Sequence, residues 1–294
     1  MPPRHSVSTA SNSARRCREE AKPNPNVIPH EESHLDHRDD ELSRFATEQL
    51  WKKNSPHKPA ALRGDPPPEC MVHDLRHVCG HDPRSLRTGE LATWRGFSAS
   101  AVSYTFDDNS PNQFSVAQPM FDARGLHATF FCIVGSLSPS QWATIESASA
   151  KGHEIGSHTL SHPDLTKLTD AQVITEESAA KKLIESHTGK KCVSLAYPYC
   201  TVPKESITSQ YYSFARSCNG SLVPSTPSDF LSIGSLGPDG GMDGPSDRAA
   251  SSGSWLVWLI HGIDDTNACC PIHASLLESN LDYVTASPNK WWIE

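Results

Sequence analysis

From about residue 98 the sequence alternates between short apolar runs and longer segments with helical spacing. The apolar runs predict strands, and the segments between them predict helices. The predicted strands cover residues 101–106, 127–134, 153–155, 193–197, 214–217, 230–233, 255–260 and 291–293. The predicted helices cover residues 111–124, 139–150, 170–187 and 272–285. This alternation indicates βα units with mainly parallel strands, and roughly 200 residues of it predict an α/β barrel.

Polar residues mark two of the predicted helix boundaries. Ser138 followed by Pro139 is typical of a helix N-terminus, because serine accepts a backbone hydrogen bond there and proline fits the first helical position. Asp170 is expected to cap the following long helix, and Gly189 is expected to end it.

Residues 1 to about 60 are polar and mixed in charge, without helical or strand periodicity, except that residues 41–53 are compatible with a short amphipathic helix. Such a segment buries too little apolar surface to offset the entropy cost of ordering. We therefore predict a disordered extension over residues 1–97 and a folded domain over residues 98–294. The hydrophobic fraction of 36% agrees with this division. One Cys–His cluster in the extension is either a polar linker or a zinc site of unusual spacing: Cys70, His73, His77, Cys79 and His81.

The charge and the apolar runs exclude several kinds of partner. A net charge of -8 argues against nucleic acid and anionic membranes, because both attract positive surfaces. The densest apolar run, residues 255–260, is far shorter than the ~20 residues of a membrane-spanning helix. No signal peptide is visible after Met1.

Nine cysteines at irregular spacing do not predict a disulfide framework, and Cys132 is expected to be a small buried hydrophobe.

Two polar motifs are candidate metal ligands. Asp107 and Asp108 follow a predicted strand, where adjacent side chains point in different directions, so one can ligate a metal while the other handles a proton. His158 and His162 have a spacing that puts both imidazoles on one face of a helical turn. Two histidines and one carboxylate form the three-ligand set of a catalytic zinc site. The alternative is that both motifs are ordinary polar loops.

A third candidate is His261, which follows the predicted strand 255–260. An imidazole at a strand end can act as a general acid, since the ordinary pKa of histidine is ~6.5. The alternative is a packing or capping histidine. Asp264 and Asp265 follow closely and either orient this imidazole or belong to a turn.

Taken in order, these motifs resemble those of the polysaccharide deacetylases, carbohydrate esterase family 4 with the NodB homology domain. The resemblance covers about residues 98–294. It rests on the following residues: Thr105-Phe106-Asp107-Asp108, Gly152-His153-Glu154-Ile155-Gly156-Ser157, His158-x-x-x-His162, Ala196-Tyr197-Pro198-Tyr199 and Leu259-x-His261. It implies a distorted (β/α) barrel and a metal-dependent hydrolase that removes acetyl groups from N- or O-acetylated sugars. The expected substrates are chitin, chitooligosaccharides or peptidoglycan.

The resemblance also implies a role for each motif residue. Asp108, His158 and His162 hold a divalent metal, with Zn²⁺ expected first and Co²⁺ or another divalent ion as the alternatives. Asp107 is implied to be the general base and His261 the general acid.

Two further residues are implied to contact the substrate. The backbone N–H of Tyr199 contributes to the oxyanion hole, and Leu259 lines the pocket for the acetyl methyl group.

Two positions depart from the family pattern, and one family residue has no assigned counterpart. Many members have an arginine at the position of Ala196, where it orients the general base; here Arg216 is either its substitute or a surface residue. Cys200 stands where glycine is usual, so a left-handed backbone there is expected to be strained. The aspartate that tunes the catalytic histidine is not assigned, and its candidates are Asp229, Asp239 and Asp264.

Two alternative functions remain compatible with the sequence. One is a non-catalytic relative that binds glycan. Another is the same barrel acting on a small non-sugar amide or an acetylated xylan ester. The family usually continues into another helix beyond the position of Glu294, so a C-terminally shortened domain is one expectation. The resemblance implies an extracellular or cell-envelope location, which the N-terminal sequence does not itself predict.

Overall fold

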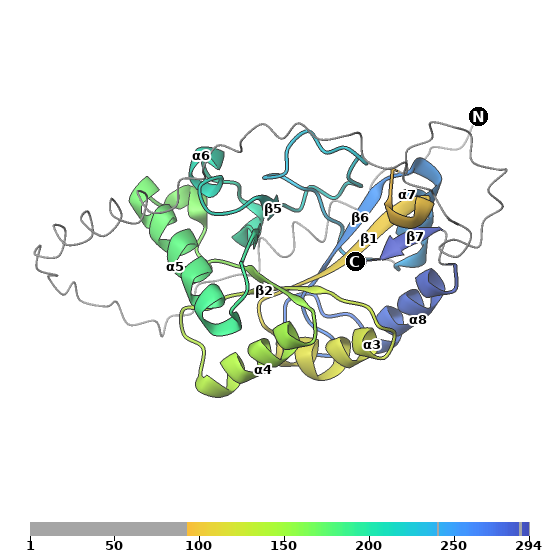
Figure 1. Ribbon diagram of the computed structural model, residues 1–294, viewed down its shortest axis with the longest axis horizontal. Helices are drawn as coiled ribbons and strands as arrows, with labels where there is room; N and C mark the ends of the chain where they lie inside the picture. The colour runs from red at the N-terminus through yellow and green to blue at the C-terminus, as the bar shows by residue number, and fades with distance from the viewer. Residues whose placement is uncertain (1–92, 240, 288–289, 294) are drawn as a thin grey trace, which may run out of the picture. The chain divides into compact units, whose positions relative to one another are not determined.

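The computed structural model describes residues 93–239, 241–287 and 290–293. Figure 1 shows how their helices and strands are arranged. The predictions for residues 1–92, including the disordered extension and the Cys–His cluster between Cys70 and His81, lie outside the described residues.

Seven strands within the described residues form one sheet, and all pairings between them are parallel. The strand order is β5-β4-β3-β2-β1-β6, and β7 also pairs with β1. The strands are β1 Ser100–Asp107, β2 Thr129–Cys132, β3 Glu154–Ser157, β4 Ser194–Ala196, β5 Phe214–Arg216, β6 Trp255–Ile260 and β7 Trp291–Ile293. The predicted parallel α/β architecture is confirmed.

β1 lies at the centre of the sheet because three strands pair with it. Its alternate residues Val102, Tyr104 and Phe106 are fully buried in the main hydrophobic core. Thr105 and Asp107 point to the opposite face, since side chains alternate along a strand. This second face is also buried, and it leads directly to the polar residues at the end of the strand.

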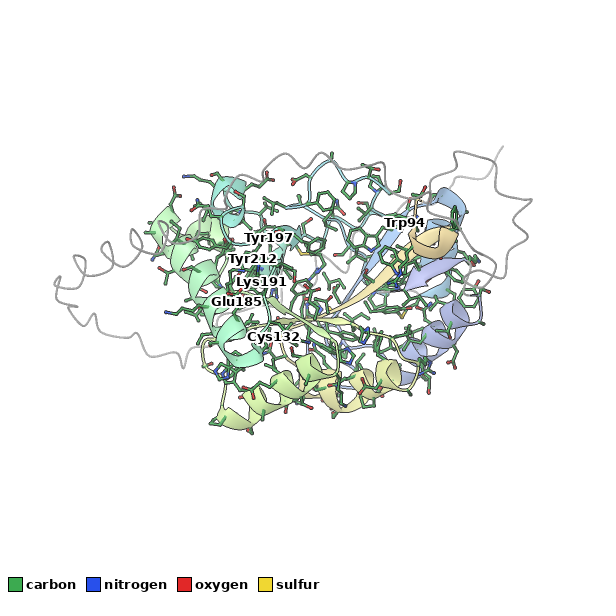
Figure 2. All side chains as sticks on the ribbon, viewed as in Figure 1. Trp94, Cys132, Glu185, Lys191, Tyr197 and Tyr212 are labelled. Carbon is green, nitrogen blue, oxygen red and sulfur yellow. A yellow bond between two sulfur atoms is a disulfide. The ribbon has the colours of Figure 1, made fainter. Side chains whose placement is uncertain are left out.

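The main helices are α3 Gln118–Asp122, α4 Pro139–Ala150, α5 Asp170–Thr188, α6 Glu205–Thr208, α7 Asp243–Ser252 and α8 Ala274–Thr285. In Figure 1, α5, α4, α3 and α8 follow one another around the outside of the sheet. No helix within these described ranges is long and apolar enough to cross a bilayer. Cys132, labelled in Figure 2, is 1% exposed, as expected for a small buried hydrophobe.

The predicted helix ends are confirmed with one correction. Ser138 caps α4 in a capping box with Gln141. The cap of α5 is Thr169, which forms a capping box with Gln172, whereas Asp170 is the first helical residue. Thr169 is the cap because its hydroxyl accepts a hydrogen bond from the Gln172 N–H, while the Gln172 side chain accepts one from the Thr169 N–H. Gly189 ends α5 in the left-handed conformation, with φ of 66°.

Residues 230–236 connect the two outer strands of the sheet. The predicted strand 230–233 does not form a regular strand; Ile233 makes an isolated parallel bridge to Arg216 in β5. Leu236 makes a second bridge to Trp258 in β6. The sheet therefore curls into a distorted barrel whose last gap is spanned by single bridges.

Candidate active site

Polar residues gather where the parallel strands end. Asp107 is the last residue of β1, Arg216 the last residue of β5, and His261 follows β6 directly. His158 follows β3, and Tyr199 lies in the turn after β4. Because the carboxyl ends of parallel strands meet at one edge of a curled sheet, these side chains come from distant parts of the chain to one place.

Three of these side chains could hold a metal ion. Asp108, His158 and His162 each offer a ligand atom, and these atoms lie within 4.8 Å of one another. The Asp108 Oδ1 atom lies 3.3 Å from His158 Nε2 and 3.5 Å from His162 Nε2. It is buried and has no hydrogen-bond partner among the described residues. An unpaired buried carboxylate oxygen facing two imidazole nitrogens fits a divalent cation.

The hydrogen bonding of His158 favours the ligand form. Its Nδ1 lies 2.7 Å from the Ala196 carbonyl oxygen, which can only accept a hydrogen bond. Nδ1 therefore carries the proton, and the lone pair of Nε2 is directed at Asp108 and His162. His158 is 2% exposed. Burial opposes its charge, but the Asp107 and Asp108 carboxylates outweigh burial and raise the pKa of His158.

The pKa values of the two neighbouring groups, His162 and Asp108, are both lowered, but for different reasons. Burial and the nearby His158 lower the pKa of His162 to about 4, so this imidazole is neutral at physiological pH. For Asp108, burial opposes ionisation, but the electrostatic influence of the surrounding imidazoles of His158, His261 and His162 outweighs burial and lowers the pKa of the carboxyl group. The cluster thus offers a carboxylate and at least one neutral imidazole, the forms that ligate metals.

The segment between the two histidines is a loop, and the helical turn expected from their spacing is absent from it. Thr159 and His162 have positive φ values of 66° and 60°. The Glu176 side chain on α5 holds this loop by accepting hydrogen bonds from the N–H groups of Leu160 at 3.0 Å and Ser161 at 2.9 Å. The two imidazoles therefore converge through left-handed backbone geometry and an external carboxylate.

Asp107 and Arg216 form a buried ion pair. Arg216 Nη2 donates to Asp107 Oδ2, and the two residues are only 1% and 3% exposed. The interpretation of Arg216 as a surface residue is therefore wrong. The other oxygen, Asp107 Oδ1, is buried and has no hydrogen-bond partner among the described residues. Asp107 Oδ2 lies 3.9 Å from His158 Nε2, so this carboxylate borders the candidate metal site.

His261 reaches the same cluster from another side. Its Nε2 lies 3.8 Å from Asp108 Oδ2, whereas both other histidines face Oδ1. Asp264 instead pairs with His273 at 3.1 Å. Asp265 accepts a hydrogen bond from Ser110 at 2.5 Å.

Asp229 accepts a hydrogen bond from the Leu231 N–H at 2.8 Å. None of the three candidates, Asp229, Asp239 and Asp264, forms an ion pair with His261 in the described part of the chain. Asp108 is the acidic partner recorded for that ring within the described residues.

Tyr199 and Leu259 lie near the cluster. The Tyr199 ring packs edge-on against His162, with 4.7 Å between ring centroids. Tyr199 and Cys200 both have left-handed backbones, with φ of 54° and 61°, as expected for Cys200 from the family's usual glycine. Leu259 pairs in register with Thr105, which places it on the same face of the sheet as Asp107.

A disulfide joins Cys200 to Cys218, with 5.3 Å between their Cα atoms. The irregular spacing of nine cysteines gave no signal for this pair, because only the barrel brings the turn after β4 next to the end of β5. The bond ties the residue after Tyr199 to a residue two positions beyond Arg216. Sequence reasoning also missed Glu176 and Gln113, whose contacts are with backbone atoms of distant loops.

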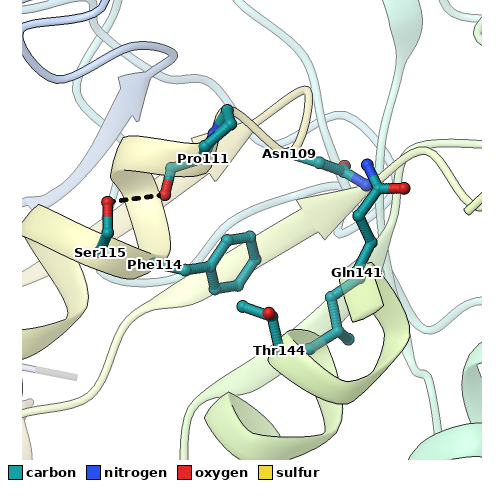
Figure 3. Close-up of a pocket in the computed structure, with 7 residues that line it drawn as sticks. Asn109, Pro111, Phe114, Ser115, Gln141 and Thr144 are labelled. Atoms are coloured by element: carbon teal, nitrogen blue, oxygen red, sulfur yellow. Dashed lines mark hydrogen bonds between the residues drawn. The ribbon is translucent and has the colours of Figure 1, made fainter. Parts of the chain in front are cut away.

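A cavity of about 330 Å³ lies beside the loop after β1 (Figure 3). Its lining residues are Asn109, Pro111, Phe114, Ser115, Gln141, Thr144 and Ile145. The hydroxyl groups of Ser115 and Thr144 donate to carbonyl oxygens of their own segments, each at 3.1 Å. The cavity is therefore largely apolar, and the three candidate metal ligands are outside its lining.

Residues 95–212 match the polysaccharide deacetylase family. A gellan lyase from Bacillus sp is 30% identical over 176 residues, which are 59% of this chain and 7% of the lyase. A chitooligosaccharide deacetylase from Bradyrhizobium sp. (strain ANU 289) is 37% identical over 89 residues, 29% of this chain and 39% of that protein. The chain thus spans less than two fifths of either curated relative.

A solved structure has a similar fold. It is that of a peptidoglycan N-acetylglucosamine deacetylase, with a TM-score of 0.50 and 16% sequence identity. The match covers 67% of this chain and 86% of that chain.

Proposed function

The chain carries a domain of the polysaccharide deacetylase family, and from this premise we propose that it is a metal-dependent deacetylase of acetylated glycans. The observation that carries the proposal is the convergence of Asp108, His158 and His162 beside Asp107 and His261. A site that only binds sugar needs neither a buried carboxylate paired with arginine nor an imidazole on the other side of the cluster. We assign the catalytic domain to residues 98–294.

We assign Asp108, His158 and His162 as the metal ligands, with Zn²⁺ as the expected ion. When bound, the ion supplies Lewis acidity toward the acetyl carbonyl and a position for water. The support is the donor set of one carboxylate and two imidazoles, and the unpaired Asp108 Oδ1 at its centre. Co²⁺ and other divalent ions with similar ligand preferences are the alternatives.

Asp107 is assigned as the general base. Its free oxygen, Oδ1, is available to take the proton from water that attacks the acetyl carbonyl. Arg216 holds the other oxygen and so fixes the direction of the carboxylate. Arg216 therefore replaces, from β5, the arginine that many relatives carry at the position of Ala196.

His261 is assigned as the general acid that protonates the leaving amine or alcohol. It approaches Asp108 Oδ2, on a different side of the cluster from Asp107, which lies nearest His158. Base and acid must act on opposite parts of the tetrahedral intermediate, so this separation suits the reaction. The backbone N–H of Tyr199 is assigned to the oxyanion and Leu259 to the acetyl methyl group. An oxyanion donor of this kind contributes about 2.7–4 kcal/mol in other hydrolases.

For the substrate, we propose short oligomers of N-acetylglucosamine. The support is the 37% identity to the chitooligosaccharide deacetylase. Because the matched segment is only 29% of this chain, the same test should also include chitin, peptidoglycan and acetylated xylan as substrates. The disulfide between Cys200 and Cys218 supports an oxidising location, and we propose that the protein acts outside the cytosol, at the cell envelope or beyond.

The test is acetate release from a panel of acetylated glycans, with metal analysis of the same sample. We expect release from N-acetylglucosamine oligomers, loss of release after chelation, and recovery when a divalent ion is added back. The Asp107→Asn variant should bind the metal but release acetate at least a hundredfold more slowly. Glycan binding without acetate release in metal-replete protein would refute the enzyme and support the binding relative.

A further inference from the structure

One buried glutamine side chain connects the end of β1 to the end of β6. Gln113 is 0% exposed, and its Nε2 donates to the Asp107 carbonyl oxygen and to the His261 carbonyl oxygen at 2.7 Å. Both partners are carbonyl oxygens, so only the amide NH₂ can face them, and this fixes the orientation of the amide group. The side chain therefore bridges the backbones of the two residues assigned as base and acid.

Gln113 begins an unusual turn of helix. It is the first residue of η3, Gln113–Ala117, a π-helical turn that continues into α3. The Gln118 N–H donates to the Gln113 carbonyl oxygen, five residues earlier in the chain. Turns of this kind are rare and occur frequently at functional sites.

Two residues just before this turn reinforce the bridge. Asn112 Nδ2 donates to the Ile263 carbonyl oxygen at 2.8 Å. The Ser110 hydroxyl donates to Asp265 Oδ2 at 2.5 Å. We call Ser110, Asn112 and Gln113 the clasp, because together they hold the loop that begins at His261.

The clasp matters more for His261 than for Asp107. Asp107 is held by Arg216 and, as a strand residue, by its pairing with Phe131 of β2. His261 comes after Ile260, the last residue of β6 that pairs with β1. Removing Gln113 should therefore displace the His261 imidazole while leaving the Asp107 carboxylate in place.

We propose that Gln113 is a positioning residue that fixes His261 relative to Asp107, an inference that rests on the proposed deacetylation. A mispositioned general acid has a specific consequence. An amide releases an amine, which must be protonated as it leaves, whereas 4-nitrophenyl acetate releases a stabilised phenolate that needs no proton. Loss of Gln113 should therefore slow amide hydrolysis and spare hydrolysis of the activated ester.

The experiment compares Gln113→Met with Gln118→Met in the metal-loaded 294-residue chain. Gln118 is the matched control, since it is 5% exposed on the same helical segment but its amide donates to Asp122, at 3.4 Å. For Gln113→Met we expect kcat on N-acetylglucosamine oligomers to fall by about 30- to 100-fold, with KM within twofold and the ester rate within threefold. Gln118→Met should stay within threefold on both substrates.

A second variant keeps the test valid if Gln113→Met does not fold. Asn112→Ala removes one hydrogen bond from the partly exposed part of the clasp, and we expect a three- to tenfold loss on the amide with no loss on the ester. Equal losses on amide and ester, or no loss on the amide, would overturn the role of Gln113. A wild-type protein that hydrolyses the ester but no acetylated sugar would instead overturn the proposed function and, with it, this inference.

Discussion

Replacing Arg216 by methionine is expected to lower the free energy of unfolding by about 3–5 kcal/mol, because it leaves the Asp107 carboxylate buried without its partner. The two residues are 1% and 3% exposed, so water cannot take the place of the guanidinium. Arg216 also donates to the Ser235 hydroxyl at 3.2 Å and lies 5.3 Å from the centre of the Phe131 ring. Methionine retains most of the packing volume, so the loss should be mainly electrostatic.

The size of the pair interaction can be separated from the loss of packing. In Asp107→Asn/Arg216→Met both charges are absent, and exchanging a whole buried pair for neutral groups is often nearly neutral. We therefore expect the double variant to be less destabilised than the sum of the two single variants by at least about 2 kcal/mol.

The assay is urea unfolding of the wild type, both single variants and the double variant. It is done in the presence of chelator, so that metal binding adds no stability to the folded state. A loss below about 1 kcal/mol for Arg216→Met, or additivity within about 0.5 kcal/mol, would refute the reasoning.

Three further outcomes are expected. Burial raises the pKa of Glu177 to about 7, against the hydrogen bond from Thr208, so ionisation destabilises the folded state increasingly as pH rises from about 4 to 7. In urea unfolding, Glu177→Gln should thus raise the free energy of unfolding by up to about 3 kcal/mol at pH 8 and leave it unchanged near pH 4. An equal increase at both pH values would contradict this prediction. Glu176→Ala should weaken zinc binding about tenfold in titration calorimetry, because the loop between His158 and His162 loses the carboxylate that accepts its backbone hydrogen bonds. An unchanged zinc affinity would show that Glu176 does not position the two histidines. Replacing Cys200 and Cys218 by serine should lower the free energy of unfolding by about 3 kcal/mol, measured by thermal unfolding. An unchanged melting temperature would contradict this prediction.

The sequence alone allowed most of the strands and the candidate ligand residues to be predicted, because both depend on local patterns. The apolar runs at 101–106 and 255–260 correspond to β1 and β6, since strands covered on both faces are apolar throughout. The spacing of His158 and His162 made them candidate ligands, whereas the family resemblance selected Asp108 over Asp107. The convergence of the three comes from left-handed loop residues and not from a helical turn.

Features that depend on tertiary contacts were not predictable. The spacing of Cys200 and Cys218 carries no pairing signal, and Gln113 acts on the backbone of a residue that is remote in the chain. The cap of α5 was misassigned by one residue, because Thr169 and Asp170 are both good capping residues and only the contact with Gln172 decides between them.

The parallel pairing of β1 with β6 has a consequence for biosynthesis. Asp107 is made long before His261, and at the ~5–20 residues per second of translation the interval between them is on the order of 10 s. A chain still attached to the ribosome can present Asp108, His158 and His162 while the strand that positions His261 does not yet exist. On the proposed function, the three candidate metal ligands are therefore synthesised before the proposed general acid, and activity should depend on completion of β6.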